Sequence, residues 1–123
     1  MVRYRLVYWK SIFEMNTFKK EEKMHFNFAL FSNHILENNA KLKWIFREDP
    51  VDELDNGWRF LSKIDNEEYL SNPKNMSVCD WSTIVEIEPA VLSIYDMPIG
   101  TELTLIYEGE QRYFIDTNTG SKI

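Results

Sequence analysis

Two stretches in the first half of the chain have the apolar content that is typical of strands. Residues 26–36 are rich in aromatic and aliphatic side chains, and in residues 41–47 every second side chain is apolar. On an extended backbone, Leu42, Trp44 and Phe46 would therefore share one face. Asparagine-rich turn residues lie between the two stretches, so the pattern predicts that they form a β-hairpin.

Short elements are expected in the middle of the chain. Trp58 and Phe60 alternate with the arginine between them, as in a short strand. Asp65, with Glu68 three residues later, resembles the N-cap of a helix. Pro73 would stop that helix after a few residues.

The last third of the chain predicts two further helical segments and a hairpin. Asp80 is a suitable N-cap for a helix over residues 81–87. Pro89 would begin another helical turn, because proline is well tolerated at the first helical position. Residues 101–107 and 111–115 flank a Glu-Gly-Glu turn and alternate as strands do, so they predict a C-terminal hairpin.

The order of these elements is strands, then short helices, then strands. Long helices do not alternate with strands, which disfavours a doubly wound parallel fold. We expect an α+β fold with a mainly antiparallel sheet and short helices packed on one side. Three segments are expected: an N-terminal strand (residues 2–9) and charged connector within residues 1–25, an α+β domain over residues 26–116, and a frayed C-terminal tail over residues 117–123.

The composition is that of one domain with an ample core. The chain has 123 residues, of which 44% are hydrophobic and 15% aromatic. Cys79 is the single cysteine, so no internal disulfide can form, and this favours a reducing compartment. No apolar run approaches the ~20 residues of a membrane span, and no signal peptide is visible. The expected location is the cytoplasm, without a membrane partner.

Charge is unevenly distributed along the chain, which has a net charge of -6. Residues 1–25 carry six bases and three acids, whereas residues 47–116 carry 16 acids and 5 bases. An acidic surface repels nucleic acid and anionic lipid and favours a basic protein partner. The same charge is also compatible with acids that only keep the domain in solution.

No catalytic or metal-binding motif stands out. Cys79 has no adjacent histidine and is expected to be a small buried residue. His25 and His34 would point to opposite faces of an extended segment, which disfavours a shared metal site. The acids of residues 49–55 depart from the EF-hand order. We therefore expect no enzyme activity, no metal and no cofactor, although a site built from paired carboxylates stays open because carboxylates are plentiful.

An ordered set of residues resembles a known family. The set comprises Arg47-Glu48, an acidic loop, Asp55-Asn56-Gly57-Trp58-Arg59-Phe60, Glu68-Tyr69, Asn72-Pro73, Asp80, Ile84, Pro89 and Met97-Pro98-Ile99-Gly100. From about Phe28 to Ile115 it is similar to a small bacterial domain that is classed among the immunity proteins of polymorphic toxin systems. The chain departs from the family where Lys63-Ile64-Asp65 stands in place of a Gly-Asp-Glu-like run, so contacts made by that loop are not carried over.

The resemblance implies an antitoxin-like role, in which the domain binds a cognate toxin and blocks it without chemistry. Nuclease toxins tend to be basic around their nucleic-acid site, so an acidic loop would attract such a toxin and cover its cleft. The candidate partner-binding residues are Glu48, Asp49, Asp52, Glu53, Asp55 and Trp58.

Each of these candidates has a structural alternative. Trp58 would be a binding hot spot if exposed and a core residue if buried. The acids would then serve only solubility. Two other classes of function are also compatible with the sequence: a stand-alone intracellular domain with a regulatory or scaffolding role, and an enzyme that uses carboxylates in a cleft.

Overall fold

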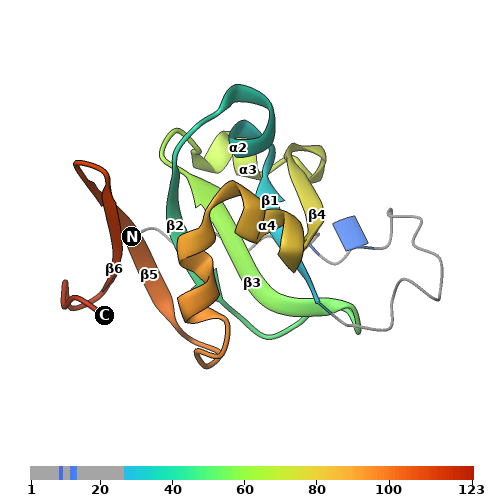
Figure 1. Cartoon of the computed structure of the whole chain (residues 1–123). Helices are drawn as coiled ribbons and strands as arrows, with labels where there is room; N and C mark the ends of the chain where they lie inside the picture. Colours follow the sequence, from blue (N-terminus) through green and yellow to red (C-terminus); the bar gives the residue numbers. More distant parts are fainter. Residues whose placement is uncertain (1–8, 10–11, 14–26) are drawn as a thin grey trace.

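The computed structural model describes Trp9, Ile12, Phe13 and residues 27–123, and within them six strands form one sheet (Figure 1). The strand order is β4-β1-β3-β2-β5-β6. In chain order the elements are β1 (Phe28–Ser32), α2 (Asn33–Asn38), β2 (Leu42–Arg47), β3 (Asp55–Ser62), α3 (Glu67–Leu70), the 3-10 helix η2 (Pro73–Asn75), β4 (Met76–Asp80), α4 (Trp81–Ile87), the 3-10 helix η3 (Pro89–Ile94), β5 (Glu102–Glu108) and β6 (Gln111–Asp116). Strands β1 and β3 are parallel and the other neighbours are antiparallel. The predicted α+β class with a mainly antiparallel sheet is confirmed.

Strands β1 and β2 do not pair with each other, so the predicted hairpin is wrong. Strand β3 lies between them, parallel to β1 and antiparallel to β2. The chain leaves β1 through a helix, because the Ser32 hydroxyl accepts a hydrogen bond from the His34 N–H at 3.3 Å and caps α2. Asn39, with a φ of 52°, ends this helix. The helix separates β2 from β1 and leaves the position beside β1 to β3.

A β-bulge in β2 reverses the direction of its side chains. The register with β3 shifts between Leu42 and Trp44. Leu42 and Ile45 consequently lie in the core on one face of the sheet, while Trp44 and Phe46 pack on the other. The prediction that Leu42, Trp44 and Phe46 share a face is therefore wrong, because one extra residue breaks the period of two.

Helices α4 and η3 cover one face of the sheet (Figure 1). Asp80 caps α4, with its carboxylate accepting from the Ser82 N–H at 2.8 Å, and Pro89 begins η3. Both helix starts confirm the predictions. Trp81 and Ile84 of α4 are buried in the core that this face forms.

The opposite face of the sheet is covered in part by N-terminal side chains. Trp9, Ile12 and Phe13 are helical and are only 1%, 2% and 3% exposed. The Trp9 ring stacks on Phe46 with 6.1 Å between ring centres. Apart from Trp9, which is helical, the strand predicted over residues 2–9 lies outside the described residues, as does the charged connector. The sheet is thus the middle layer, with apolar side chains packed on both faces.

Helix α3 begins one residue later than predicted. Its N-cap is Asn66, whose side-chain oxygen accepts from the Tyr69 N–H at 2.8 Å. Asp65 is buried and makes other hydrogen bonds, which are described below. The helix is brief, as expected, and ends ahead of Pro73.

Strands β5 and β6 form the predicted C-terminal hairpin. Residues 117–123 were expected to fray, but they turn back along β6. The Ile123 N–H donates to the Phe114 carbonyl at 2.9 Å, and Lys122 forms an isolated bridge with Ile115. These bonds cover part of the edge strand, which would otherwise expose unpaired backbone groups.

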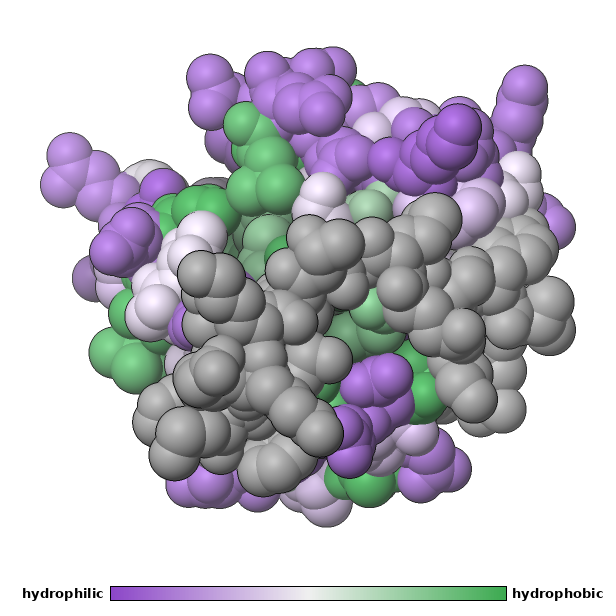
Figure 2. All heavy atoms as spheres, turned by 90° about the vertical axis from the view of Figure 1, so that its right-hand side faces the viewer, coloured by the Kyte–Doolittle hydropathy of each residue, from purple (hydrophilic) through white to green (hydrophobic). Residues whose placement is uncertain are grey.

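The side of the molecule that faces right in Figure 1 has a mixed surface. Hydrophilic residues gather along its upper rim, and hydrophobic residues are visible below them (Figure 2). None of the helices in the described part of the chain has the length and apolar character needed to cross a membrane.

Candidate functional site

Gly57 brings the two ends of the acidic segment together. Its carbonyl accepts from the Glu48 N–H at 2.9 Å, and its φ is 89°. A Cβ at this position would lie 2.3 Å from the Glu48 carbonyl oxygen. Glycine alone meets both the positive φ and the close approach. The structure therefore requires glycine at this position of the ordered pattern.

Arg59 lies fully buried at the centre of an ion-pair network. Its Nη1 and Nη2 donate to the two carboxylate oxygens of Asp55 at 2.8 and 2.7 Å, and its Nε donates to Glu48 Oε2 at 2.8 Å. The Trp9 ring centre lies 5.3 Å from the guanidinium carbon. A buried charge is stable only when it is paired and hydrogen-bonded. Both oxygens of Asp55 are occupied in this way, so that carboxylate offers nothing to a partner.

Trp58 is a core residue. Its side chain is 0% exposed and packs in the cluster under α4 and η3. Its Nε1 donates to the Tyr95 carbonyl at 3.3 Å, and its ring lies 6.3 Å from the Trp81 ring. The Arg47 guanidinium lies 5.6 Å from the Trp58 ring centre. The sequence left two hypotheses for Trp58, a binding hot spot or a core residue, and the geometry supports the core residue.

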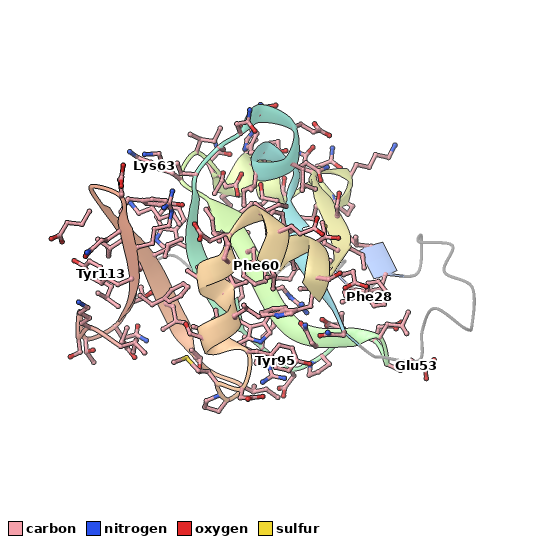
Figure 3. All side chains as sticks on the ribbon, viewed as in Figure 1. Phe28, Glu53, Phe60, Lys63, Tyr95 and Tyr113 are labelled. Carbon is pink, nitrogen blue, oxygen red and sulfur yellow. The ribbon has the colours of Figure 1, made fainter. Side chains whose placement is uncertain are left out.

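The other acidic candidates lie on the loop between β2 and β3. Asp49 and Glu53 are exposed, whereas Glu48 and Asp52 are half-buried. Figure 3 shows Glu53 at the outer end of this loop. We call Glu48, Asp49, Asp52 and Glu53 the acidic loop. The structure therefore separates the loop acids from Asp55, which belongs to the interior.

Hydrogen bonds hold the acidic loop in one conformation. The Asp52 carboxylate accepts from the Leu54 N–H at 3.0 Å, and the Asp52 carbonyl accepts from the Asp55 N–H at 3.1 Å. Asp55 Oδ2 accepts from the Val51 N–H at 2.9 Å. A loop that is ordered before binding loses less conformational entropy when a partner arrives.

A buried carboxylate that the sequence did not reveal joins β1, α2 and β3. Asp65 Oδ1 accepts from the Ser32 hydroxyl at 2.8 Å and lies 2.6 Å from His34 Nδ1. Asp65 Oδ2 accepts from the Ser62 N–H at 2.6 Å. The His34 ring stacks on Tyr69, with 3.6 Å between ring centres. Asp65 was predicted to cap α3 instead, and nothing in the sequence placed it beside Ser32 and His34.

The same cluster is not arranged for nucleophilic catalysis. A histidine base must contact the hydroxyl that it activates. Here the Ser32 hydroxyl donates to Asp65, and the His34 ring contacts Asp65 as well. Burial and the nearby Asp65 carboxylate raise the pKa of Tyr69, so its hydroxyl keeps its proton at neutral pH. The geometry is that of a structural hydrogen-bond cluster.

Cys79 is buried, as predicted. Burial, helped by the Asp80 carboxylate, raises the pKa of its thiol to about 11. The thiolate is the reactive form of cysteine, so this thiol is inert at neutral pH. Within the described residues, no group of three or more histidine, cysteine or acidic side chains is arranged to hold a metal ion.

Within the ordered pattern, Gly57 and Arg59 join β3 to the acidic loop, and the Arg47 guanidinium donates to the Met97 carbonyl. This is the pattern of an immunity protein. The chain belongs to the Immunity protein Imm33 domain family, which matches residues 29–116. The match runs from β1 to the end of β6, and the resemblance is confirmed. Comparison with curated proteins and with solved structures finds no match.

Family membership indicates a toxin-neutralising function and implies a protein partner, the cognate toxin. Several residues of the pattern nevertheless serve the fold: Gly57 allows a tight approach, Trp58 fills the core, and Asp55 pairs with Arg59. The pattern therefore identifies the family through residues that maintain its structure.

Proposed function

We propose that this protein neutralises a cognate toxin by binding it directly, without chemistry, in the cytoplasm. The observation that carries the proposal is the family match over residues 29–116, which includes the whole sheet apart from its first residue. Direct binding is the simplest way for a domain with a fixed surface loop to block another protein.

The acidic loop is the proposed contact with a basic toxin. Asp49 and Glu53 are exposed at its surface, and Asp52 is half-buried beside them. Carboxylates held in a fixed array imitate the phosphates that a nuclease toxin binds, and they accelerate association. Glu48 contributes less, because Arg59 pairs with it. Asp55 and Trp58 support the loop from the interior.

The proposal that the protein is not an enzyme draws support from the state of its reactive groups. The Cys79 thiol has a pKa of about 11, and the carboxylates of Asp55 and Asp65 are occupied by internal hydrogen bonds. A carboxylate acting as a general base needs a free lone pair in reach of substrate. A stand-alone regulatory or scaffolding domain is the second candidate function, since it too would bind a protein without chemistry.

Co-expression tests the main proposal. Toxin domains encoded beside the gene are expressed with and without this protein, and growth and co-purification are measured. We expect growth to be restored and the toxin to co-purify. If every adjacent toxin kills in the presence of the protein and none co-purifies, the immunity role is wrong and the scaffolding role is favoured.

The contact surface is tested separately with the double variant D49N/E53Q. We expect weaker binding to the toxin and a smaller dependence of affinity on salt, because two exposed charges are lost. The matched control is E67Q/E68Q, which removes two exposed acids from α3. Equal affinity and equal salt dependence for wild type and D49N/E53Q would contradict the acidic-loop contact while leaving the immunity role intact.

A further inference from the structure

Strands β2 and β5 separate at one end of the sheet (Figure 1). They pair at three positions, of which the last is Trp44 with Thr104. Strand β5 nevertheless continues to Glu108, paired there with β6. The Tyr107 hydroxyl crosses the gap and donates to the Leu42 carbonyl at 2.8 Å. Beyond Thr104, the edge of β5 that faces β2 has no strand partner among the described residues.

A cleft of about 320 Å³ lies at this gap. We call it the lysine cleft, and its lining residues are Lys41, Lys43, Lys63, Leu105, Ile106 and Tyr107. An adjoining cavity of about 210 Å³ shares Lys41 and Tyr107 with it and adds Arg112. Figure 3 shows Lys63 at the upper left, pointing outward beside the separating strands, at the opposite end of the molecule from Glu53.

The local charge of the lysine cleft is positive, whereas the net charge of the protein is negative. In the described part of the chain, Lys41, Lys43 and Lys63 form no ion pair. Arg112, in contrast, is bonded to Glu88 at 2.8 Å. Three lysines without an ion pair to any described residue thus line one hollow, although the net charge of the whole chain is -6. Such a local concentration of charge attracts a group of opposite sign.

Aromatic rings lie beside two of the three lysines, Lys41 and Lys43, and beside Arg112. Lys41 Nζ and the Arg112 guanidinium carbon each lie 5.0 Å from the Tyr107 ring centre, and Lys43 Nζ lies 5.0 Å from that of Trp44. Cation–π contacts of this kind restrict a flexible side chain. Burial and the Glu88 carboxylate raise the pKa of Tyr107, so its hydroxyl keeps the proton that bonds the Leu42 carbonyl.

We propose that the lysine cleft binds a short, acidic, extended segment of the toxin. Carboxylates of the segment would pair with Lys41, Lys43 and Lys63, and its backbone would lie along the free edge of β5 near Ile106. Addition of a strand to a free edge provides backbone hydrogen bonds, and the flanking side chains provide selectivity. This inference rests on the proposed function, since the toxin supplies the segment. It adds a second contact, of opposite polarity to the acidic loop.

A peptide fits the cleft better than a nucleic acid does. Counting only described residues as partners, the unpaired edge of β5 spans the four residues after Thr104, which suits one extended strand. Glu108 and Glu110 stand at the hairpin tip where this edge ends, outside the lining of the cleft, and would repel a polyanion long enough to extend past the lysines. A segment with two or three carboxylates meets the lysines at short range, whereas charges farther away are screened over about 8 Å at physiological salt.

The cleft is tested without the toxin, by titrating the protein with a short synthetic peptide that alternates Glu and Thr. Binding is followed by NMR shifts of residues 41–44 and 105–107. We expect K41Q/K43Q/K63Q to weaken binding roughly tenfold, the effect of losing several exposed ion pairs. The matched control K74Q removes an exposed lysine of η2 and should leave the affinity unchanged.

Three outcomes would overturn the inference. These are no binding at millimolar peptide, equal binding by wild type and the triple variant, or tighter binding of a single-stranded oligothymidylate than of the peptide. The toxin assay distinguishes the two proposals. If no toxin is neutralised but the peptide still binds in the cleft, the immunity role fails and the acidic-segment site stands.

Discussion

The acidic loop and the strand that follows it carry the same residue types in opposite environments. Glu53 is exposed at the outer end of the loop, whereas Asp55 is 5% exposed and bonded to Arg59 through both oxygens. A carboxylate in water needs no partner, but a buried one is stable only with a paired cation and full hydrogen bonding. One acidic run in the sequence is therefore two features, a surface charge and an internal support.

The largest effect on stability is expected when the buried cation of Arg59 is removed. The variant R59M leaves Asp55 buried without its partner, and we expect a loss of about 3–5 kcal/mol in the free energy of unfolding. Urea denaturation at neutral pH measures it. The control D55L/R59M removes both charges and should lose less than R59M does. A loss below about 1 kcal/mol for R59M would show that Asp55 is hydrated.

The turn that joins loop and strand is the next target. In G57A the new Cβ would meet the Glu48 carbonyl at 2.3 Å, in a backbone with a φ of 89°. We expect a loss of about 2–3 kcal/mol from strain. Gly109 also has a positive φ, 62°, but nothing lies near its missing Cβ. The control G109A should therefore cost about 1 kcal/mol, and equal losses in thermal melts of the two variants would contradict the role of the close contact.

Asp52 is half-buried, between the exposed loop acids and the buried Asp55, so its substitution should have an intermediate effect on stability. The variant D52A removes the acceptor for the Leu54 N–H, which it bonds at 3.0 Å. We expect a loss of about 1 kcal/mol, typical of a side chain that satisfies one backbone donor. Hydrogen exchange at the Leu54 amide should accelerate more in D52A than in the control E53A. Unchanged exchange would mean that the loop does not depend on this bond.

The smallest effect is expected at the exposed end of the loop. The variant D49N/E53Q should change the free energy of unfolding by less than about 0.5 kcal/mol, since neither side chain is buried. Chemical denaturation measures it beside wild type. A destabilisation as large as that of D52A would remove the distinction between surface charge and internal support.

The starts of α4 and η3 and the last hairpin were predicted well because they depend on neighbours in the chain. Asp80 caps α4 through the amide of Ser82, and Pro89 begins η3. The hairpin of β5 and β6 turns over a few residues. In each case the interacting groups lie within a few positions, so local chemistry is decisive.

The pairing of β1 and β2 was mispredicted because strand neighbours are chosen at long range. The Ser32 cap diverts the chain into α2, and β3 then takes the place beside β1. The bulge after Leu42 likewise depends on the register with β3. The alternation of apolar and polar residues along one strand reveals neither which strand becomes its neighbour nor where a bulge shifts the register.

The candidate site shows the same division. The acidic residues and Trp58 were found as one pattern, but their exposure depends on Arg59 and on the helices above Trp58. The lysine cleft was not found at all, because its lining comes from separate parts of the sequence: Lys41 and Lys43 at the start of β2, Lys63 after β3, and residues 105–107 of β5. Charge counted along the chain does not reveal which charges meet in space.

The sequence by itself determined the family, the α+β class, the charge asymmetry and the helix starts that Asp80 and Pro89 provide. These properties rest on residue identity and on interactions between near neighbours. The tertiary structure alone decided that Asp55 and Trp58 are interior while Glu53 is exposed, and it alone brought three lysines around one cleft. The physical reason is that burial and ion pairing depend on which distant strands become neighbours, and that choice is made by packing the whole sheet.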